Sequence, residues 1–226
     1  MNQINLFLAG DSTMATYDVK RAPQMGWGQV LDQYFNEQVK VWNEAMPGRS
    51  TKTFIQEGRQ KRIYQLIRPG DYLFVQFGHN DSKVDSNRYT EPFTTYKENL
   101  GIFISNARDK GAFPVLLTPV QRRNFSINGK IVDKHGNYPL AMRDLAIELS
   151  SVPLIDITKR STIMLENIGP ELSKHLYMWI KPGDYKYYPD GKEDNTHFTE
   201  LGANKIAQLV IEGIKDLRLP IAKFIK

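Results

Sequence analysis

The sequence alternates between short apolar runs and longer stretches with helical periodicity, and this alternation limits the folds open to the chain. Five runs rich in β-branched and aromatic residues have the length of strands: 4–9, 39–43, 72–77, 113–118 and 153–157. Apolar residues recur at helical spacing in five stretches: near 28–35, in the basic stretch after Pro47-Gly48 that ends near residue 67, over 95–110, over 138–150, and at 206–217. Such alternation builds βαβ units, so we expect an α/β fold with a five-stranded parallel sheet.

The composition supports a globular protein and removes several kinds of site. Of the 226 residues, 41% are hydrophobic, which is enough to build a core. The chain has no cysteine, which excludes disulfides, thiolate metal ligands and a cysteine nucleophile. It has no linker, repeat or low-complexity tract, so we expect one domain over residues 1–226.

The start of the sequence bears on where the protein resides. Only four apolar residues, 6–9, stand together before Gly10-Asp11, and no positively charged segment precedes them. A secretory signal needs both a positive start and a longer apolar run, and a membrane span needs about 18 apolar residues. The sequence therefore predicts a cytoplasmic protein without a membrane partner.

The positive charge of the chain is concentrated in one stretch. With 30 Lys and Arg against 25 Asp and Glu, the net charge is +5. Between Arg49 and Arg68 there are six basic residues and a single acid, Glu57. Such a run indicates either a helix that binds a polyanion or, more commonly, a solvated helix face.

Polar residues with small neighbours follow several of the expected strands. Ser12 lies in Gly10-Asp-Ser-Thr after the first strand, Gly48 follows the second, and Asn80 lies in Gly78-His-Asn-Asp after the third. Asp194 and His197 stand just before the last helix. Because ligands bind at the carboxyl ends of the strands in an open parallel sheet, we expect these residues to share one edge.

Ser, Asp and His at one edge are the residue types of an activated serine nucleophile. A carboxylate three residues before a histidine can hold the imidazole and fix its tautomer. Taken alone, Ser12 would be an ordinary helix N-cap. The α/β-hydrolase pattern is excluded because the chain has no G-x-S-x-G. A dinuclear metal site is disfavoured because His79 and Asn80 stand in the opposite order to the G-N-H-[DE] motif of such sites.

Four ordered motifs resemble those of the SGNH or GDSL hydrolases: Gly10-Asp-Ser-Thr, Gly48, Asn80 and His197. Their surroundings, including Gly26-Trp-Gly-Gln and Gln76-Phe-Gly-His-Asn-Asp, resemble the bacterial rhamnogalacturonan acetylesterases. The resemblance implies a three-layer α/β/α sandwich with a flavodoxin-like sheet in the order 2-1-3-4-5. It implies no cofactor and no metal.

The resemblance also assigns roles to residues of the candidate site. It implies that Ser12 is the nucleophile, His197 the base and Asp194 the residue that orients it. The backbone N–H groups of Ser12 and Gly48 and the amide of Asn80 would form the oxyanion hole. The chain carries Pro47 directly before Gly48, which constrains this loop without removing the Gly48 donor.

Two polar segments, 121–136 and 177–196, interrupt the alternation and are expected to be functional loops. Aromatic residues crowd the second, where Trp179 and Tyr185 are candidates for stacking on sugar rings. Arg49 is a candidate partner for a uronate carboxylate, and His79 for a substrate contact. His135 and His175 have no recognisable partner and are interpreted as surface residues.

The resulting hypothesis is a serine esterase that removes O-acetyl groups from pectic rhamnogalacturonan, through an acyl-enzyme intermediate. Its partner would be an acetylated anionic oligosaccharide rather than a nucleic acid. Two alternatives stay open: a lipase or thioesterase of the same fold, and a polyanion-binding module that uses the basic helix. The sequence does not determine the oligomeric state.

Overall fold

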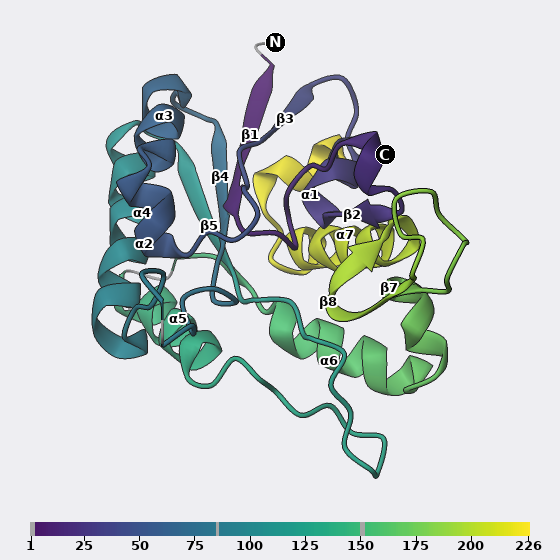
Figure 1. Cartoon of the computed structure of the whole chain (residues 1–226). Helices are drawn as coiled ribbons and strands as arrows, with labels where there is room; N and C mark the ends of the chain where they lie inside the picture. Colours follow the sequence, from purple (N-terminus) through teal and green to yellow (C-terminus); the bar gives the residue numbers. More distant parts are fainter. Residues whose placement is uncertain (1–2, 85, 150–151) are drawn as a thin grey trace.

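A five-stranded parallel sheet forms the centre of the protein. The computed structural model describes residues 3–84, 86–149 and 152–226. The sheet consists of β3 (Val39–Asn43), β1 (Ile4–Gly10), β4 (Tyr72–Gln76), β5 (Phe113–Leu117) and β6 (Leu154–Ile155), in that spatial order (Figure 1). Numbered within this sheet alone, the order is 2-1-3-4-5, so the fold prediction is confirmed.

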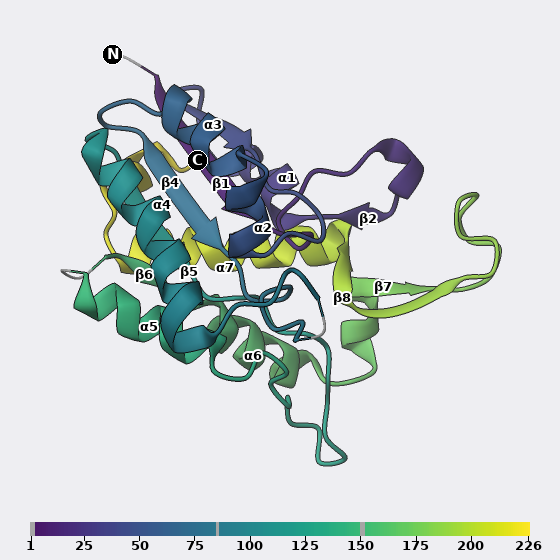
Figure 2. The same ribbon diagram turned by 60° about the vertical axis from the view of Figure 1, so that its left-hand side comes forward.

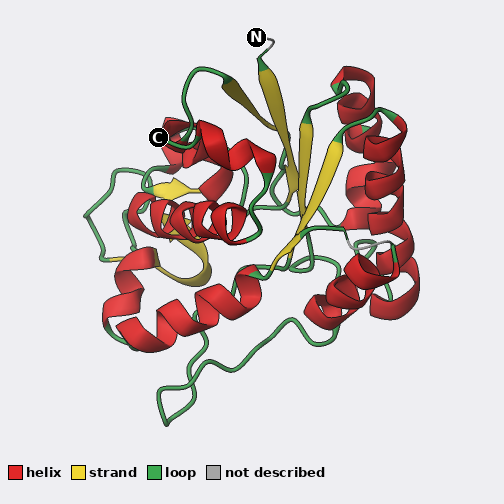
Figure 3. Ribbon diagram, turned by 180° about the vertical axis from the view of Figure 1, so that it is seen from behind, coloured by secondary structure: helices red, strands yellow, loops and turns green. Residues whose placement is uncertain are grey.

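Helices cover both faces of the sheet. Helices α2 (Thr51–Gln56), α3 (Arg59–Leu66), α4 (Lys97–Asp109) and α5 (Tyr138–Glu148) pack on one side, and α1 (Trp27–Val30), α6 (Ile157–Ile168) and α7 (Glu200–Asp216) on the other (Figures 1 and 3). Every residue of β4 is buried, as expected for a central strand covered on both faces.

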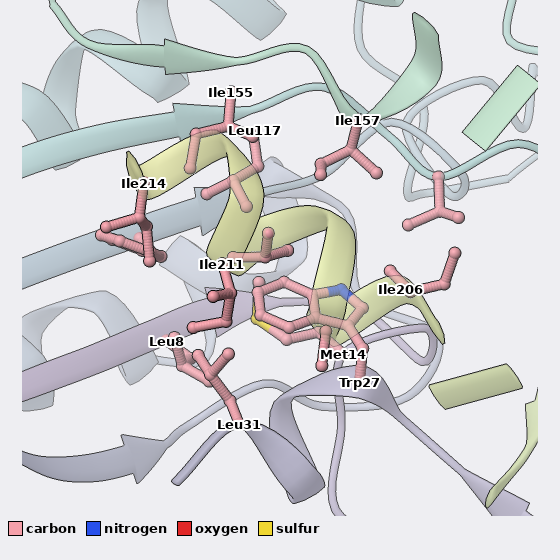
Figure 4. Packing of buried hydrophobic residues seen from close by; sticks show 14 of the residues in the cluster. Leu8, Met14, Trp27, Leu31, Leu117, Ile155, Ile157, Ile206, Ile211 and Ile214 are labelled. Atoms are coloured by element: carbon pink, nitrogen blue, oxygen red, sulfur yellow. The ribbon is translucent and has the colours of Figure 1, made fainter. Parts of the chain in front are cut away.

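The alternation of side chains along β1 divides the core into two clusters. Leu6 and Leu8 point to the side of α7, whereas Phe7 and Ala9 point to the opposite cluster. On the α7 side, Leu8 packs among Trp27, Ile211 and other buried side chains (Figure 4). The sheet is therefore fixed from both faces, and its carboxyl edge is a rigid support for the loops that follow each strand.

Several helix boundaries differ from the expectation. The basic stretch forms two helices because Gly58, at φ +72°, adopts a left-handed conformation between α2 and α3. The helix expected over 28–35 is α1 followed by a 3₁₀ turn at Leu31–Tyr34, and the helix expected over 95–110 begins with a π-helical turn at Pro92–Tyr96.

The end of the sheet differs as well. The fifth strand is shorter than expected, and Ile157 begins α6, a helix that the sequence pattern did not indicate. The side chain of Asp156 caps this helix by accepting from the Lys159 N–H. The expected helix over 138–150 ends at Glu148, and residue 150 lies outside the described residues.

A second, antiparallel sheet of three strands lies beside α7. It contains β2 (Gln24–Met25), β8 (Lys192–Thr199) and β7 (Tyr177–Ile180), in that order. The prediction of a loop over 177–196 is therefore wrong for the two ends of that segment, which form β7 and the start of β8, and right for residues 181–191 between them. The side chains of Tyr177, Met178 and Ile180 in β7 are buried, while β8 is polar along most of its length. Segment 121–136 is irregular apart from a bridge between Phe125 and Ile131.

No helix in the three described ranges combines the length and apolar character that crossing a bilayer requires.

Candidate active site

Ser12 lies in a tight turn directly after β1, the strand whose neighbours in the sheet are β3 and β4. Gly10 pairs with Gln76 at the end of β4, so the turn stands beside the segment that begins at Gly78. Ser12 itself is 9% exposed. Its hydroxyl is therefore presented at the carboxyl edge of the sheet from a largely buried turn.

A chain of buried hydrogen bonds holds this turn. The Trp27 indole donates to Oε1 of Gln76, the Gln76 amide donates to Oγ1 of Thr13, and the Thr13 hydroxyl donates to Oδ1 of Asp11. The distances are 2.9, 2.7 and 2.8 Å. Burial raises the pKa of Asp11, although the hydrogen bonds from Thr13 act in the opposite direction. The network fixes the backbone on both sides of Ser12.

His197 reaches Ser12 from the second sheet. The Ser12 hydroxyl donates to Nε2 of His197 across 3.0 Å, and Nδ1 of His197 donates to Oδ2 of Asp194 across 2.7 Å. The structure thus brings together the three residues that the sequence selected for the triad. Their arrangement is the one in which a carboxylate orients an imidazole and the imidazole receives a serine proton.

A large bulge in β8 aims the imidazole. Adjacent residues Tyr177 and Met178 of β7 pair with Phe198 and Asp194, so residues 195–197 have no opposite partner in the register. Oδ1 of Asp194 closes the bulge by accepting from the N–H groups of Thr196 and His197, at 2.8 and 3.0 Å. The Asp-x-x-His spacing therefore works through a turn within a strand, and not through a helix.

Asp194 is held in its charged form. Burial opposes ionisation, but the hydrogen bonds and charge of His197 and the nearby Lys192 outweigh it and lower the pKa of the carboxyl far below its usual range. Nζ of Lys192 lies 3.0 Å from Oδ2 of Asp194. The carboxylate is thus available to stabilise an imidazolium at any pH at which an esterase is assayed.

The candidate oxyanion donors come from three neighbouring loops. Gly48 has φ +80°, a conformation that favours glycine and turns the loop after β3. Among the described residues, neither the Ser12 N–H nor the Gly48 N–H has a hydrogen-bond acceptor. Asn80 is 7% exposed, and its Nδ2 donates to the Arg49 carbonyl at 3.0 Å. The N–H groups of Ser12 and Gly48 are therefore available to a ligand, beside the Asn80 side-chain amide, which is held by the Arg49 carbonyl.

A cavity of about 300 Å³ opens over these groups. Its lining is Ser12, Tyr17, Arg21, Gln24, Pro47, Gly48, His79, Asn80, Lys83, Arg88, Arg122, Lys192, Thr196 and His197. Five of these residues are basic, and no described lining residue is acidic. A larger hollow of about 510 Å³ lies at the amino end of the sheet, near Asn5 and Asp71, where no serine stands beside a histidine.

Of the substrate-binding candidates, only His79 lines this cavity. Nε of Arg49 instead lies 2.9 Å from Oε1 of Glu57, and its NH1 donates to the Pro47 carbonyl. Trp179 donates to Asn195, contacts the cations of Arg123 and Lys174, and does not line this cavity. Tyr185 is exposed in the segment between β7 and β8 and does not line the cavity.

The interpretation of His135 as a surface residue is wrong. His135 is 1% exposed; its Nδ1 lies 2.7 Å from Oδ1 of Asp133 and its Nε2 lies 3.3 Å from Nδ1 of His79. Burial and the surrounding cationic groups lower the pKa of His79 well below the usual range, so the His79 ring is neutral. The sequence could not pair these histidines because 56 positions separate them. His175 is exposed, as expected.

Within residues 3–84, 86–149 and 152–226, no three His, Asp or Glu side chains are grouped so that they could hold a metal ion.

Comparison with known proteins gives a consistent result. The pattern of the GDSL-like Lipase/Acylhydrolase family matches residues 6–210. The chain is 50% identical over 218 residues to the rhamnogalacturonan acetylesterase RhgT of Bacillus subtilis, covering 96% of this chain and 92% of that protein. It is 44% identical over 222 residues to the probable rhamnogalacturonan acetylesterase YesY of the same organism, covering 98% and 97%.

A solved structure extends the likeness to the fold. The crystal structure of Bacillus subtilis YxiM superposes with a TM-score of 0.83 at 29% identity, over 97% of this chain. The chain spans 58% of that longer protein. Because the family pattern covers most of the sequence and the close relatives match nearly end to end, the chain belongs to the GDSL-like lipase/acylhydrolase family.

Proposed function

We propose that this protein is a serine esterase that removes O-acetyl groups from rhamnogalacturonan chains or their fragments. The observation that carries the proposal is the continuous hydrogen-bonded line from Ser12 through His197 to Asp194, set in a cavity lined by cations. The relatives RhgT and YesY, whose names state this activity or its probability, support the choice of substrate.

The first half of the reaction follows from the geometry. Nε2 of His197 accepts the Ser12 proton while Oγ attacks the acetyl carbonyl carbon. Asp194 keeps Nδ1 protonated and stabilises the imidazolium that forms. The imidazolium then returns the proton to the departing sugar oxygen, which leaves an acetyl group on Ser12. Water, activated by the same histidine, releases acetate.

Charge on the carbonyl oxygen needs donors that are in place before the reaction. The N–H groups of Ser12 and Gly48 have no other described acceptor, and Asn80 contributes a side-chain donor. Loss of one such donor typically reduces kcat about 10² to 10³-fold, so each donor of this set contributes substantially to the rate.

The charge of the cavity favours an anionic sugar chain. Arg21, Lys83, Arg88 and Arg122 line it in addition to Lys192, which is paired with Asp194. These side chains offer N–H donors to a uronate carboxylate, and rhamnogalacturonan carries such a carboxylate on each galacturonate. These side chains, rather than Arg49, which is bound to Glu57, are therefore the candidate partners of the uronate.

The alternatives receive less support from the same residues. An acyl-chain enzyme needs an apolar wall, whereas the cavity lining has no aliphatic side chain apart from Pro47 among its described members. The basic stretch proposed as a polyanion site has Arg49 and Arg59 paired with Glu57, and Arg62 facing Glu44. A carbohydrate acetylesterase therefore accounts best for the site.

The decisive measurement is acetate release from acetylated rhamnogalacturonan beside acetylated xylan at equal acetyl content. We expect the anionic polymer to be the better substrate by kcat/KM. Faster release from xylan would contradict the proposed substrate while leaving the esterase chemistry intact.

The Ser12→Ala variant tests the chemistry itself. We expect it to lose ester cleavage on both polymers and on p-nitrophenyl acetate, with an unchanged thermal unfolding midpoint, because the alanine fits the turn without new contacts. Residual activity close to that of the wild type would show that Ser12 is not the nucleophile.

A further inference from the structure

The oxyanion role of Asn80 depends on which end of its amide faces the reacting oxygen. The two ends of an Asn amide have nearly the same shape, but only Nδ2 donates hydrogen bonds while Oδ1 accepts them. An amide turned the wrong way would place a partial negative charge against the oxyanion. The site therefore needs contacts that distinguish the two orientations.

Two contacts make that distinction. Nδ2 of Asn80 donates to the Arg49 carbonyl at 3.0 Å, and Oδ1 accepts from NH1 of Arg88 at 3.2 Å. A carbonyl cannot donate and a guanidinium cannot accept, so reversal of the amide would break both contacts. One Nδ2 hydrogen is used by Arg49, which leaves the second for a ligand in the cavity.

Arg88 is itself held in place. Its Nε and its backbone N–H both donate to Oγ of Ser86, at 3.4 and 3.3 Å. The Ser86 hydroxyl in turn donates to the Lys83 carbonyl at 2.9 Å. The guanidinium is thus fixed by the turn that follows Asn80, and it also lines the cavity.

We propose that Arg88 is a positioning residue of the oxyanion hole, which locks the Asn80 amide with Nδ2 toward the reacting oxygen and places a positive charge behind it. This inference rests on the proposed esterase function. A charge-assisted hydrogen bond to Oδ1 polarises the amide and strengthens Nδ2–H as a donor. The effect belongs to the transition state, because negative charge develops only there.

The loss in kcat on removing Arg88 cannot exceed the loss on removing Asn80, if Arg88 acts through Asn80. Removal of the whole donor costs about 10² to 10³-fold in kcat, and removal of its support should cost less, on the order of tenfold. KM for a neutral ester should change little, since Arg88 acts through Asn80 and has no anion to bind on such a substrate.

The first test measures kcat and KM of Arg88→Met on p-nitrophenyl acetate. We expect kcat to fall on the order of tenfold with KM within about twofold. Arg88→Lys, which keeps the charge but not the planar fork, should recover part of the loss. Arg62→Met, on the exposed face of α3 and outside the cavity, is the matched control and should retain wild-type kcat.

A double-mutant cycle with Asn80→Ala separates positioning from other roles. If Arg88 acts through Asn80, Arg88→Met lowers kcat in the wild type but not in the Asn80→Ala background. An equal loss in both backgrounds, or none in either, would overturn the proposal. The thermal unfolding midpoint of each variant shows whether the substitution has destabilised the protein. If the midpoint of Arg88→Met is lowered, Arg88→Gln and Arg88→Lys replace it in the cycle.

The outcome is distinguishable from a failure of the proposed function. If the wild type cleaves no ester at all, the esterase proposal fails and the cycle has no starting rate. If the wild type cleaves p-nitrophenyl acetate and the cycle shows no coupling, only the role of Arg88 is refuted.

Discussion

Asp81 joins the loops that carry two of the candidate oxyanion donors. Its Oδ1 accepts from the N–H and hydroxyl of Thr51 at 3.0 and 2.6 Å, and from the Thr90 hydroxyl at 3.1 Å. Thr51 begins α2 directly after the Gly48 loop, and Asp81 follows Asn80. A single buried carboxyl group therefore sets the spacing between Gly48 and Asn80.

Burial raises the pKa of Asp81 to about 7, although the hydrogen bonds from Thr51 and Thr90 act in the opposite direction. Since the folded-state pKa lies above the usual 3.8, the contribution to stability is full at low pH and is lost as pH rises through about 7. Asp81→Asn removes this titration. We expect the wild type to lose on the order of 2 kcal/mol relative to the variant between about pH 5 and pH 8.

The measurement is the free energy of unfolding in urea for both proteins at the two pH values. Asp11, whose charge also raises the pKa of Asp81, is present in both proteins, so the difference isolates Asp81. Parallel pH profiles would contradict the expectation.

At the residue scale, the sequence predicted the residues of the triad and of the oxyanion hole, because few residue types can perform their chemistry. Ser12, Gly48, Asn80 and His197 stand in four ordered motifs, and Asp194 precedes His197 by three residues, so their meeting could be anticipated. Arg88 and Arg122 could not be found in this way, because they come from irregular loops whose course depends on tertiary contacts.

At the scale of elements, the bulge of β8 depends on Arg123. The Arg123 N–H donates to the Asn195 carbonyl at 2.8 Å, and its NH1 donates to Oδ1 of Asn195 at 3.0 Å. The same Oδ1 accepts from the Trp179 indole at 2.8 Å. Arg123 thus anchors residue 195, two positions before the imidazole, without lining the cavity.

Arg123→Met should therefore lower kcat without touching substrate. We expect a fall on the order of tenfold with little change in KM, because the imidazole leaves the productive geometry for part of the time. The matched control is Lys174→Met, which also removes a cation from the Trp179 ring but no contact to Asn195. The low-field proton signal of His197 Nδ1–H reports the loosened bond to Asp194, and an unaltered signal and rate in Arg123→Met would refute the role.

The elements themselves were predictable to different degrees. The five strands of the parallel sheet were located because each is a short apolar run between turn signals. The hairpin of β7 and β8 was missed because β8 consists mainly of polar residues that serve the site, which hides the pattern of a strand. Helix α6 was missed because it begins only two residues after β6.

At the scale of the whole molecule, the basic residues that line the cavity do not come from the stretch of the sequence with the highest density of positive charge. Within Arg49–Arg68, Arg49 and Arg59 both pair with Glu57, and neither lines the cavity. The cavity instead collects Arg21, Lys83, Arg88, Arg122 and Lys192, which are scattered over 171 positions. Counting charges along a sequence could not reveal this, because the topology of the sheet brings these loops to one edge.

This distribution predicts a salt dependence that separates two substrates. For acetylated rhamnogalacturonan fragments, KM should rise severalfold between about 20 and 500 mM NaCl, because salt screens the attraction between the cavity and a uronate. For p-nitrophenyl acetate, kcat and KM should stay flat. Steady-state kinetics at both salt concentrations test this, and an equal response of the two substrates would argue against electrostatic recognition.

The β7–β8 hairpin has two parts with different roles: β8 carries His197 of the triad, and the segment between the strands is largely exposed to solvent. The bulge that carries His197 is tied to the body by β2 and Arg123, whereas residues 181–191 between the strands extend outward beyond it (Figure 2). The outer part still touches the cavity wall, because the Tyr188 hydroxyl donates to the Arg21 carbonyl at 3.2 Å and lies 3.4 Å from Oε1 of Gln24. The segment between Ile180 and Lys192 is therefore a place where engineering can change which sugar chains reach the cavity, provided that the contacts of Tyr188 with the cavity wall are kept.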